Sequence, residues 1–170
     1  DWNYRPFLGW IQRLRFKLVL SLLNEVKCRR MLEVGYGSGI FMPELKHHCE
    51  ELFGIDIHNK PMEVQKTLEQ IDVKTKLYST SVERTTFPDD HFDCIVAISA
   101  LEFVHDIGAA CKELRRILTP DGFLIVITPG HSKILDMGLK IITGESAERD
   151  YENRRELLMP TLLENFAVTQ

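Results

Sequence analysis

Three glycines at alternate positions, Gly35, Gly37 and Gly39, follow an apolar run and precede a helix-like pattern. An acid, Glu33, lies two residues before the first glycine. A glycine turn between a strand and a helix lets a ligand lie directly against the backbone. The dinucleotide-binding fingerprint G-x-G-x-x-G requires its last glycine where this chain has Ile40. The pattern therefore indicates a nucleotide-like ligand but departs from the dinucleotide spacing.

A second candidate for ligand chemistry is Asp56, the acid that ends the next apolar run, Leu52–Asp56. Asp56 lies roughly 20 residues beyond the first glycine, the spacing at which an acid binds the ribose hydroxyls of a nucleotide. A helix N-cap or a loop carboxylate is the alternative interpretation. Because the strand, the glycine turn and the spacing agree, we favour ribose binding.

Apolar runs that are typical of buried strands alternate with amphipathic runs along the chain. We expect strands at Met31–Gly35, Leu52–Asp56, Thr75–Thr80, Phe92–Ile98 and Phe123–Thr128, and the start of a sixth at Phe166–Gln170. We expect helices at Phe41–Cys49, Pro61–Ile71, Gly108–Leu118, Ser132–Ile142 and Leu157–Glu164, the last broken near Pro160, and a turn at Thr119–Gly122. This alternation predicts an α/β fold, a doubly wound and mostly parallel sheet with helices on both faces. Such sheets bind ligands at the carboxyl ends of their strands.

The composition is that of an ordinary globular domain, with 170 residues, 44% hydrophobic residues and a formal net charge of −4. The length suits one domain. A net negative charge gives no general attraction to nucleic acid, so we expect no nucleic-acid partner. The four cysteines form no C-x-x-C pair, so we expect no metal and a reducing, cytoplasmic location. Since the chain begins with Asp1, we expect further sequence to precede it.

The N-terminal segment Phe7–Leu23 is apolar but is interrupted by Arg13, Arg15 and Lys17. No uninterrupted stretch reaches the ~18–20 apolar residues that span a bilayer. We expect a helix whose apolar face covers the sheet. Contact with a lipid surface or a partner is the alternative for this helix.

Several motifs in the order of the chain resemble one known family. The pattern E-x-G-x-G-x-G at Glu33–Gly39, the acid Asp56, the run F-P-D-D-x-F-D at Phe87–Asp93 and the turn Ile117–Leu124 resemble the class I S-adenosylmethionine-dependent methyltransferases. The resemblance covers Leu32–Pro129. It implies a Rossmann-like fold, S-adenosyl-L-methionine as cofactor, and a final hairpin that is absent from this chain or built differently. We expect a single domain with a helical cap (1–30), a cofactor-binding core (31–130) and substrate-side helices with a partial C-terminal strand (131–170).

The resemblance also implies a set of site residues. It assigns cofactor contacts to Glu33, Gly35, Tyr36, Gly37, Gly39, Asp56, Ile57, Ser81, Val82, Ile98 and Ser99. Ser81 stands where the family often has an acid that contacts the adenine amino group, and the amide of Val82 is expected near the ring. Phe103 replaces the histidine of the family's L-E-H-V stretch. We expect Glu33 to brace the glycine turn and to attract the ammonium group of the cofactor.

The implied reaction is transfer of a methyl group by in-line displacement to a small-molecule acceptor. Such a step needs alignment and desolvation, and it needs a base only when the acceptor must lose a proton. His131 is a weak candidate for that base, whereas His105 is expected to be a surface or capping residue. A non-catalytic module that binds S-adenosylmethionine or S-adenosylhomocysteine is one alternative. A nicotinamide-dependent oxidoreductase is another, against which Ile40 and the lack of a Tyr-x-x-x-Lys pair both count.

Overall fold

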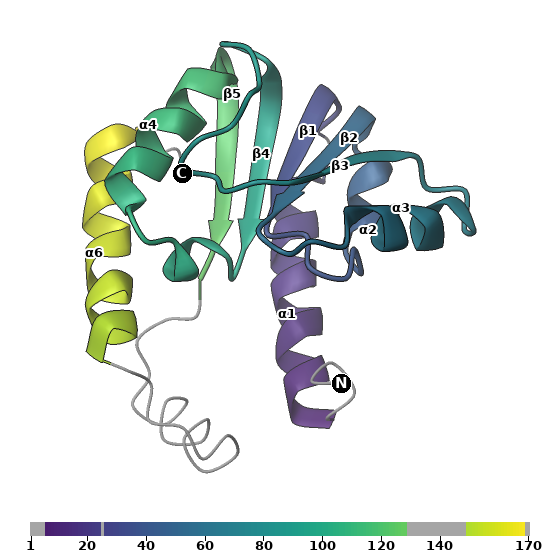
Figure 1. The fold of residues 1–170 in the computed structure, drawn as a ribbon, viewed down its shortest axis with the longest axis horizontal. Helices are drawn as coiled ribbons and strands as arrows, with labels where there is room; N and C mark the ends of the chain where they lie inside the picture. Colours follow the sequence, from purple (N-terminus) through teal and green to yellow (C-terminus); the bar gives the residue numbers. More distant parts are fainter. Residues whose placement is uncertain (1–5, 25, 129–148, 169–170) are drawn as a thin grey trace.

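A five-stranded sheet forms the centre of the molecule (Figure 1). The computed structural model describes residues 6–24, 26–128 and 149–168. The sheet has the order β3-β2-β1-β4-β5, and every neighbouring pair of strands is parallel. The strands are β1 (Cys28–Val34), β2 (Cys49–Asp56), β3 (Thr75–Ser79), β4 (Phe92–Ile98) and β5 (Leu118–Ile127). The expected doubly wound, Rossmann-like sheet is confirmed.

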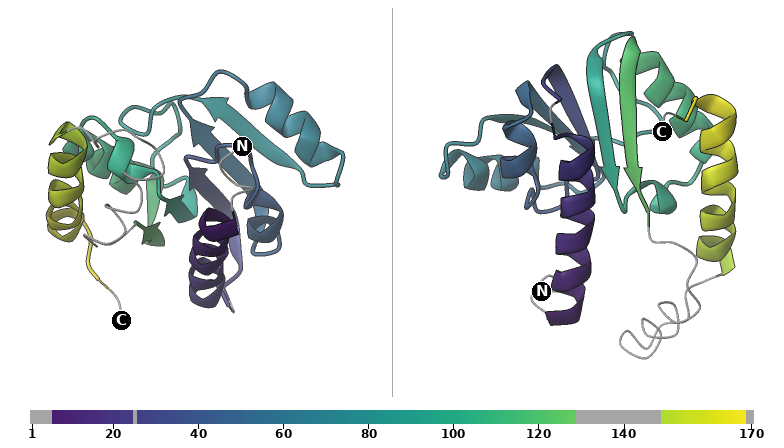
Figure 2. Two further views of the ribbon diagram at one scale, coloured as in Figure 1. Left: turned by 90° about the horizontal axis from the view of Figure 1, so that it is seen from below. Right: turned by 180° about the vertical axis from the view of Figure 1, so that it is seen from behind.

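Helices cover both faces of this sheet (Figure 2). The helices are α1 (Pro6–Leu22), α2 (Met42–Lys46), α3 (Pro61–Glu69), α4 (Ile107–Ile117) and α6 (Arg149–Asn165), with a 3-10 turn, η2 (Leu101–Phe103), after β4. Side chains of α1, α2 and α3 pack in one core cluster, and those of α4 and α6 pack in the other. The strand order reverses at β1, because β2 pairs with one side of β1 and β4 pairs with the other.

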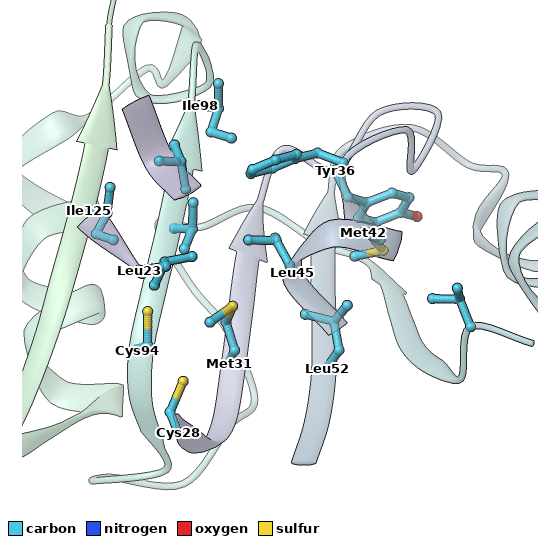
Figure 3. Close-up of a cluster of buried hydrophobic side chains, with 14 of the residues drawn as sticks. Leu23, Cys28, Met31, Tyr36, Met42, Leu45, Leu52, Cys94, Ile98 and Ile125 are labelled. Atoms are coloured by element: carbon cyan, nitrogen blue, oxygen red, sulfur yellow. The ribbon is translucent and has the colours of Figure 1, made fainter. Parts of the chain in front are cut away.

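The central strands are buried on both faces, which explains their unbroken apolar sequences. Residues Cys94–Ile98 of β4 are all buried. Alternate residues of one strand enter different clusters, so Cys94 faces α1 and α2 whereas Ile95 faces α4 and α6. Figure 3 draws the first cluster, in which Leu23 lies over β4, between Ile125 of β5 and the β1 and α2 side chains Met31 and Leu45.

Helix α1 packs on the sheet, as its pattern predicts. Val19 and Leu23, the residue just after α1, are fully buried in the first cluster, and Phe16 and Leu20 pack against it. These positions follow the three- and four-residue spacing of one helical face. Within the part of the chain that the structure describes, no helix combines the length and the hydropathy that crossing a membrane requires.

The predicted turn Thr119–Gly122 is not a separate turn between α4 and the last strand. These residues lie within β5, where the pairing with β4 jumps from Phe92–Leu118 to Cys94–Phe123. The jump leaves the Pro- and Gly-containing segment as an irregularity in the strand, where Pro is tolerated because a ladder hydrogen bond is already missing.

Helix α6 also differs from its prediction. It continues through Pro160 to Asn165 instead of breaking there. Pro160 is exposed, whereas Leu158 and Leu162 are buried against the α4 side of the core, so packing holds the helix together around the missing N–H. The sixth strand predicted from Phe166 is not formed over residues 166–168. The helix predicted at Ser132–Ile142 lies outside the described residues.

Candidate functional site

A cavity of about 450 Å³ lies at the carboxyl ends of β1, β2, β3 and β4. It is at the point where the strand order reverses, which is where open parallel sheets bind ligands. Its volume is within the range of small-molecule and cofactor sites. The cavity is lined by Val34, Gly35, Ile55, Asp56, Ile57, Thr80, Ser81, Val82, Glu83, Ser99, Ala100, Phe103, Val104 and His105.

Gly35 directly follows β1 and forms part of the cavity wall. Its φ of +77° is a conformation that residues with side chains rarely adopt. A Cβ atom at this position would lie 2.5 Å from the Cβ atom of Ala100, which lines the same cavity. Glycine is therefore required here by both the backbone conformation and the close approach of the chain after β4.

The two other glycines have different tasks. Gly37 has a φ of +53° and open space around it, and its N–H donates to Asp56 Oδ2 at 2.9 Å. Gly39 has a φ of +73°, and a Cβ there would lie 2.8 Å from Val64 Cγ1 of α3. Neither residue lines the cavity. Gly37 shapes the turn toward Asp56, and Gly39 lets the turn pack on α3.

Asp56 ends β2 and lines the cavity. Its Oδ2 accepts from the Gly37 N–H, and its Oδ1 accepts from the His58 N–H at 3.1 Å. A carboxylate offers about four lone-pair sites. After the two backbone amides are bound, acceptor capacity remains on both oxygens for a ligand that brings a pair of hydroxyl groups.

His58 is a part of this turn that the sequence patterns do not single out. Its Nδ1 accepts from the Lys60 N–H at 3.1 Å, which assigns the proton to Nε2. Nε2 then donates to the Gly37 carbonyl oxygen at 2.9 Å. The His58 ring also meets the Tyr36 ring edge-on, with centroids 4.9 Å apart. The loop after β2 thus holds the glycine turn through Asp56 on one side of Gly37 and through His58 on the other.

Glu33 lies inside β1 with 4% of its surface exposed, and it does not line the cavity. Its Oε2 atom is buried without a hydrogen-bond partner in the described residues. Burial, with a smaller effect from the negative charge of Asp56, raises the pKa of Glu33 from 4.5 to about 8. The carboxyl group is therefore largely protonated at neutral pH, which reduces the attraction of a cationic group expected from the sequence.

Tyr36 and Ile98 are core residues in this structure. Both belong to the buried cluster under α1 and α2, and neither lines the cavity. Figure 3 draws the Tyr36 ring beside Met42, and a Cβ on Gly54 would lie 2.8 Å from Tyr36 Cδ1. The bare backbone of Gly54 in β2 therefore makes room for the Tyr36 ring.

The end of β4 contributes Ser99 and Ala100 to the cavity. Ser99 has a φ of +52°, and its N–H donates to the Ile127 carbonyl oxygen at 2.7 Å. Its Oγ atom is buried without a hydrogen-bond partner among the described residues. A non-glycine residue in the left-handed region is held there by its surroundings and is often found at functional sites.

The loop after β3 provides another part of the wall. The predicted residues Ser81 and Val82 line the cavity, as does Ile57 after β2. Glu83, Phe103 and His105 line it as well. Phe103 and His105 follow the end of β4, and the sequence patterns do not assign either of them a contact with the cofactor. His131 lies outside the described residues.

The match to a family model extends over more than half of the chain. The model of the methyltransferase domain covers residues 32–126, from within β1 into β5. This chain belongs to the methyltransferase-domain family. The match includes the glycine turn, Asp56 and every described cavity residue, so the class I resemblance of the sequence motifs is confirmed.

Curated methyltransferases match the chain at low identity. Ubiquinone biosynthesis O-methyltransferase of Vibrio cholerae is 27% identical over 129 residues, which are 74% of this chain and 52% of that protein. An uncharacterized methyltransferase of Bacillus subtilis, YcgJ, is 29% identical over 111 residues, 62% of this chain and 44% of that protein. The chain thus spans about half the length of the curated relatives it matches.

Solved methyltransferase structures have the same fold. The N-methyltransferase NodS of Bradyrhizobium japonicum, in complex with S-adenosyl-L-homocysteine, superposes with a TM-score of 0.67 at 21% identity. The alignment covers 95% of this methyltransferase-family chain and 76% of NodS. This chain and that enzyme therefore share a fold.

Proposed function

We propose that this chain binds S-adenosyl-L-methionine in the cavity and transfers its methyl group to a small-molecule acceptor. The observation that carries the proposal is the combination of Gly35 and Asp56 on one cavity wall. Gly35 presents bare backbone to a ligand, and Asp56 keeps acceptor capacity for two ribose hydroxyls. Family membership favours this cofactor over the nicotinamide alternative.

The cavity wall offers apolar surface and polar groups that suit the adenine ring and the polar groups of S-adenosyl-L-methionine. Apolar residues predominate on it, among them Val34, Ile55, Val82, Ala100 and Val104, which fit an adenine ring. Ile57 and Phe103 are 80% and 60% exposed, so each leaves apolar surface open to a ligand. Gly35, Asp56, Ile57, Ser81, Val82 and Ser99 are our proposed wall contacts, while Glu33, Gly37 and Gly39 support the turn behind them.

The cofactor supplies a sulfonium-activated methyl group, so this chain has to bind, align and exclude water. The glycine turn and Asp56 fix the ligand at one end, and alignment of this kind lowers the barrier of a displacement reaction. The apolar wall removes water from the reacting groups. A base is needed only for an acceptor that must lose a proton. His105 is an ionisable side chain on the wall that could serve as this base, and His131 is the candidate from the sequence.

We also propose how the parts of the chain divide the work. Residues 31–130 hold the cofactor, residues 1–30 cap the sheet, and residues 131–170 contribute the acceptor side. Helix α6 supports this division because it packs against α4 and against η2, whose Phe103 lines the cavity. A cytoplasmic location is supported by four cysteines that are all free thiols.

The test is a calorimetric titration with S-adenosylhomocysteine and, separately, with NAD. We expect saturable binding of S-adenosylhomocysteine and none of NAD. No binding of S-adenosylhomocysteine at high micromolar concentration would overturn the proposal. Turnover is then measured as S-adenosylhomocysteine release over a panel of small oxygen and nitrogen nucleophiles, because the relatives include O- and N-methyltransferases. Binding without turnover on the whole panel would support the non-catalytic alternative.

A further inference from the structure

A pair of side chains, Ser81 and Glu83, lines the cavity in the loop after β3. Ser81 Oγ donates a hydrogen bond to Glu83 Oε2 at 2.8 Å. The backbone N–H of Glu83 donates back to Ser81 Oγ at 3.3 Å. The two residues therefore form a closed local unit on the wall.

The other oxygen of Glu83 is fixed from outside the loop. Glu83 Oε1 accepts from the backbone N–H of Asp106 at 2.6 Å. Asp106 is the N-cap of α4, and its Oδ1 accepts from the Ala109 N–H at 2.9 Å. The start of α4 thus determines which oxygen of Glu83 is left to face Ser81.

Glu83 is an acceptor at neutral pH. The Asp106 amide, and to a smaller extent the Ser81 hydroxyl, hold the pKa of Glu83 below its ordinary value against the opposing effect of burial. An ionised carboxylate only accepts hydrogen bonds. The single proton of the Ser81 hydroxyl is therefore committed to Glu83.

This arrangement decides what Ser81 offers to a ligand. A hydroxyl group has one proton and two lone pairs. With its proton on Glu83 and one lone pair facing the Glu83 amide, Ser81 presents the remaining lone pair as an acceptor. Ser79 is the register partner of Asp56 on the neighbouring strand, so Ser81 lies just beyond the ribose-binding acid. A nucleoside held by Asp56 extends its base toward this acceptor.

We propose that Glu83 is a positioning residue that fixes Ser81 as a hydrogen-bond acceptor and thereby selects a 6-aminopurine over a 6-oxopurine. The inference rests on the proposed function. The amino group of adenine donates to Ser81, whereas the carbonyl oxygen of hypoxanthine brings a second acceptor against the same lone pair. An acceptor that meets an acceptor leaves both groups unsatisfied, which costs more than a missing contact.

The substitution Glu83→Gln tests this proposal because it changes the Ser81 hydroxyl from a hydrogen-bond acceptor to a donor toward the ligand. The Asp106 N–H keeps the amide oxygen at the Oε1 position, which turns the amide NH2 toward Ser81 Oγ. The NH2 group then donates to Ser81, and the hydroxyl proton is released toward the cavity. Ser81 becomes able to donate to the 6-oxo group.

The measurement is the ratio of dissociation constants for S-adenosylhomocysteine and S-inosylhomocysteine, by calorimetry. For the natural chain we expect roughly tenfold preference for S-adenosylhomocysteine, the scale of one well-placed hydrogen bond. We expect E83Q to bring the preference to about twofold or less, or to reverse it, with improved binding of S-inosylhomocysteine. S81A removes the acceptor without touching Glu83 and is expected to reduce the preference as well. In the S81A background, E83Q is expected to change the ratio no further.

The matched control is Glu113→Gln. Glu113 also accepts hydrogen bonds from the loop after β3, from the Thr85 N–H at 2.8 Å and from the Thr85 hydroxyl at 2.7 Å. Unlike Glu83, it does not line the cavity. We expect E113Q to keep the natural preference. An unchanged ratio in both E83Q and S81A would overturn the inference while leaving the proposed function intact. A natural chain that binds neither ligand would overturn both.

Discussion

At the scale of single residues, the Asp56 carboxylate shapes the glycine turn and also lines the cavity of the proposed ligand. It accepts from the Gly37 and His58 amides and still faces the cavity. An acid at the end of a second strand is therefore also the residue that shapes the glycine turn. The sequence spacing indicates that Asp56 binds a ribose. Only the hydrogen bonds in the structure reveal that it also shapes the glycine turn.

The substitution Asp56→Ala is expected to weaken binding of S-adenosylhomocysteine by ~1.5–3 kcal/mol, the range for a hydrogen bond to a charged group. Calorimetry measures the change as roughly a 10- to 150-fold rise of the dissociation constant. The control is Glu51→Gln on the same strand, where Glu51 pairs with Arg30 and Lys76 far from the cavity wall. Equal affinities of D56A and the natural chain would contradict the ribose-binding role.

Glu33 predicts a pH dependence of stability. Its pKa rises from 4.5 to about 8 on folding, so the folded chain holds a proton that the unfolded chain releases between these values. The free energy of unfolding therefore falls as pH rises through this window, with a maximal slope of ~1.4 kcal/mol per pH unit. Urea denaturation at pH 5, 6, 7 and 8 is expected to show E33Q gaining stability relative to the natural chain as pH rises.

The control for this prediction is Glu63→Gln, because Glu63 is exposed and forms a surface ion pair with Lys60. We expect E63Q to follow the natural chain at every pH. Parallel pH profiles of E33Q and the natural chain would show that Glu33 titrates near its ordinary pKa in the folded state.

Residue types alone identify only part of the wall. The alternation of strands and turns places five wall residues at one edge of the sheet, because they lie at a strand end or within three residues after it: Gly35, Asp56, Ser81, Val82 and Ser99. Ile98 turns into the core because side chains alternate between the two faces along β4. Tyr36, in the glycine turn, packs in the same cluster, where the bare backbone of Gly54 leaves room for its ring. Glu83 and His105 reach the wall from loops, where no periodicity predicts the direction of a side chain.

At the scale of elements, burial decided which predictions succeeded. The apolar strand Phe92–Ile98 has the predicted bounds. β1 and β2 begin earlier than their apolar runs, at Cys28 and Cys49, because their first residues pair with each other across the ladder. Helix α2 ends at Lys46 instead of Cys49 for the same reason. Pro160 misled the prediction because packing of its neighbours outweighs the local cost of proline.

The destabilising effect of Pro160 on α6 can therefore be removed by substitution. Pro160 lies inside the helix and is exposed, and it lacks the N–H that the helix would use. We expect Pro160→Ala to raise the free energy of unfolding by ~1–3 kcal/mol, since proline in a helix interior costs about 3 kcal/mol relative to alanine. Urea denaturation measures the change.

The comparison is Leu162→Ala in the same helix, which removes a buried side chain. We expect this substitution to lower the free energy of unfolding by ~2–5 kcal/mol. A destabilised P160A would mean that α6 needs the proline.

At the scale of the whole molecule, ligand binding is coupled to global stability because the cavity belongs to four strands at once. S-adenosylhomocysteine at 100 times its dissociation constant is expected to add ~2.7 kcal/mol to the free energy of unfolding. For a chain of this size that raises Tm by roughly 5–10 °C. Differential scanning fluorimetry measures the shift, and D56A at the same ligand concentration is expected to show a smaller one. No shift with the natural chain would contradict binding to the folded state.

The reversal of strand order at β1 also has a consequence for how the protein is made. β1 pairs with β2 close by in sequence, but its other edge pairs with β4, more than sixty residues later, as the pair Met31–Cys94 illustrates. Closing so long a loop is entropically costly and slows the joining of the two halves. The wall formed by Gly35 and Ala100 exists only after that joining. During synthesis, the ability to bind the ligand therefore arises only after β4 has joined β1, and binding reports that the two halves have met.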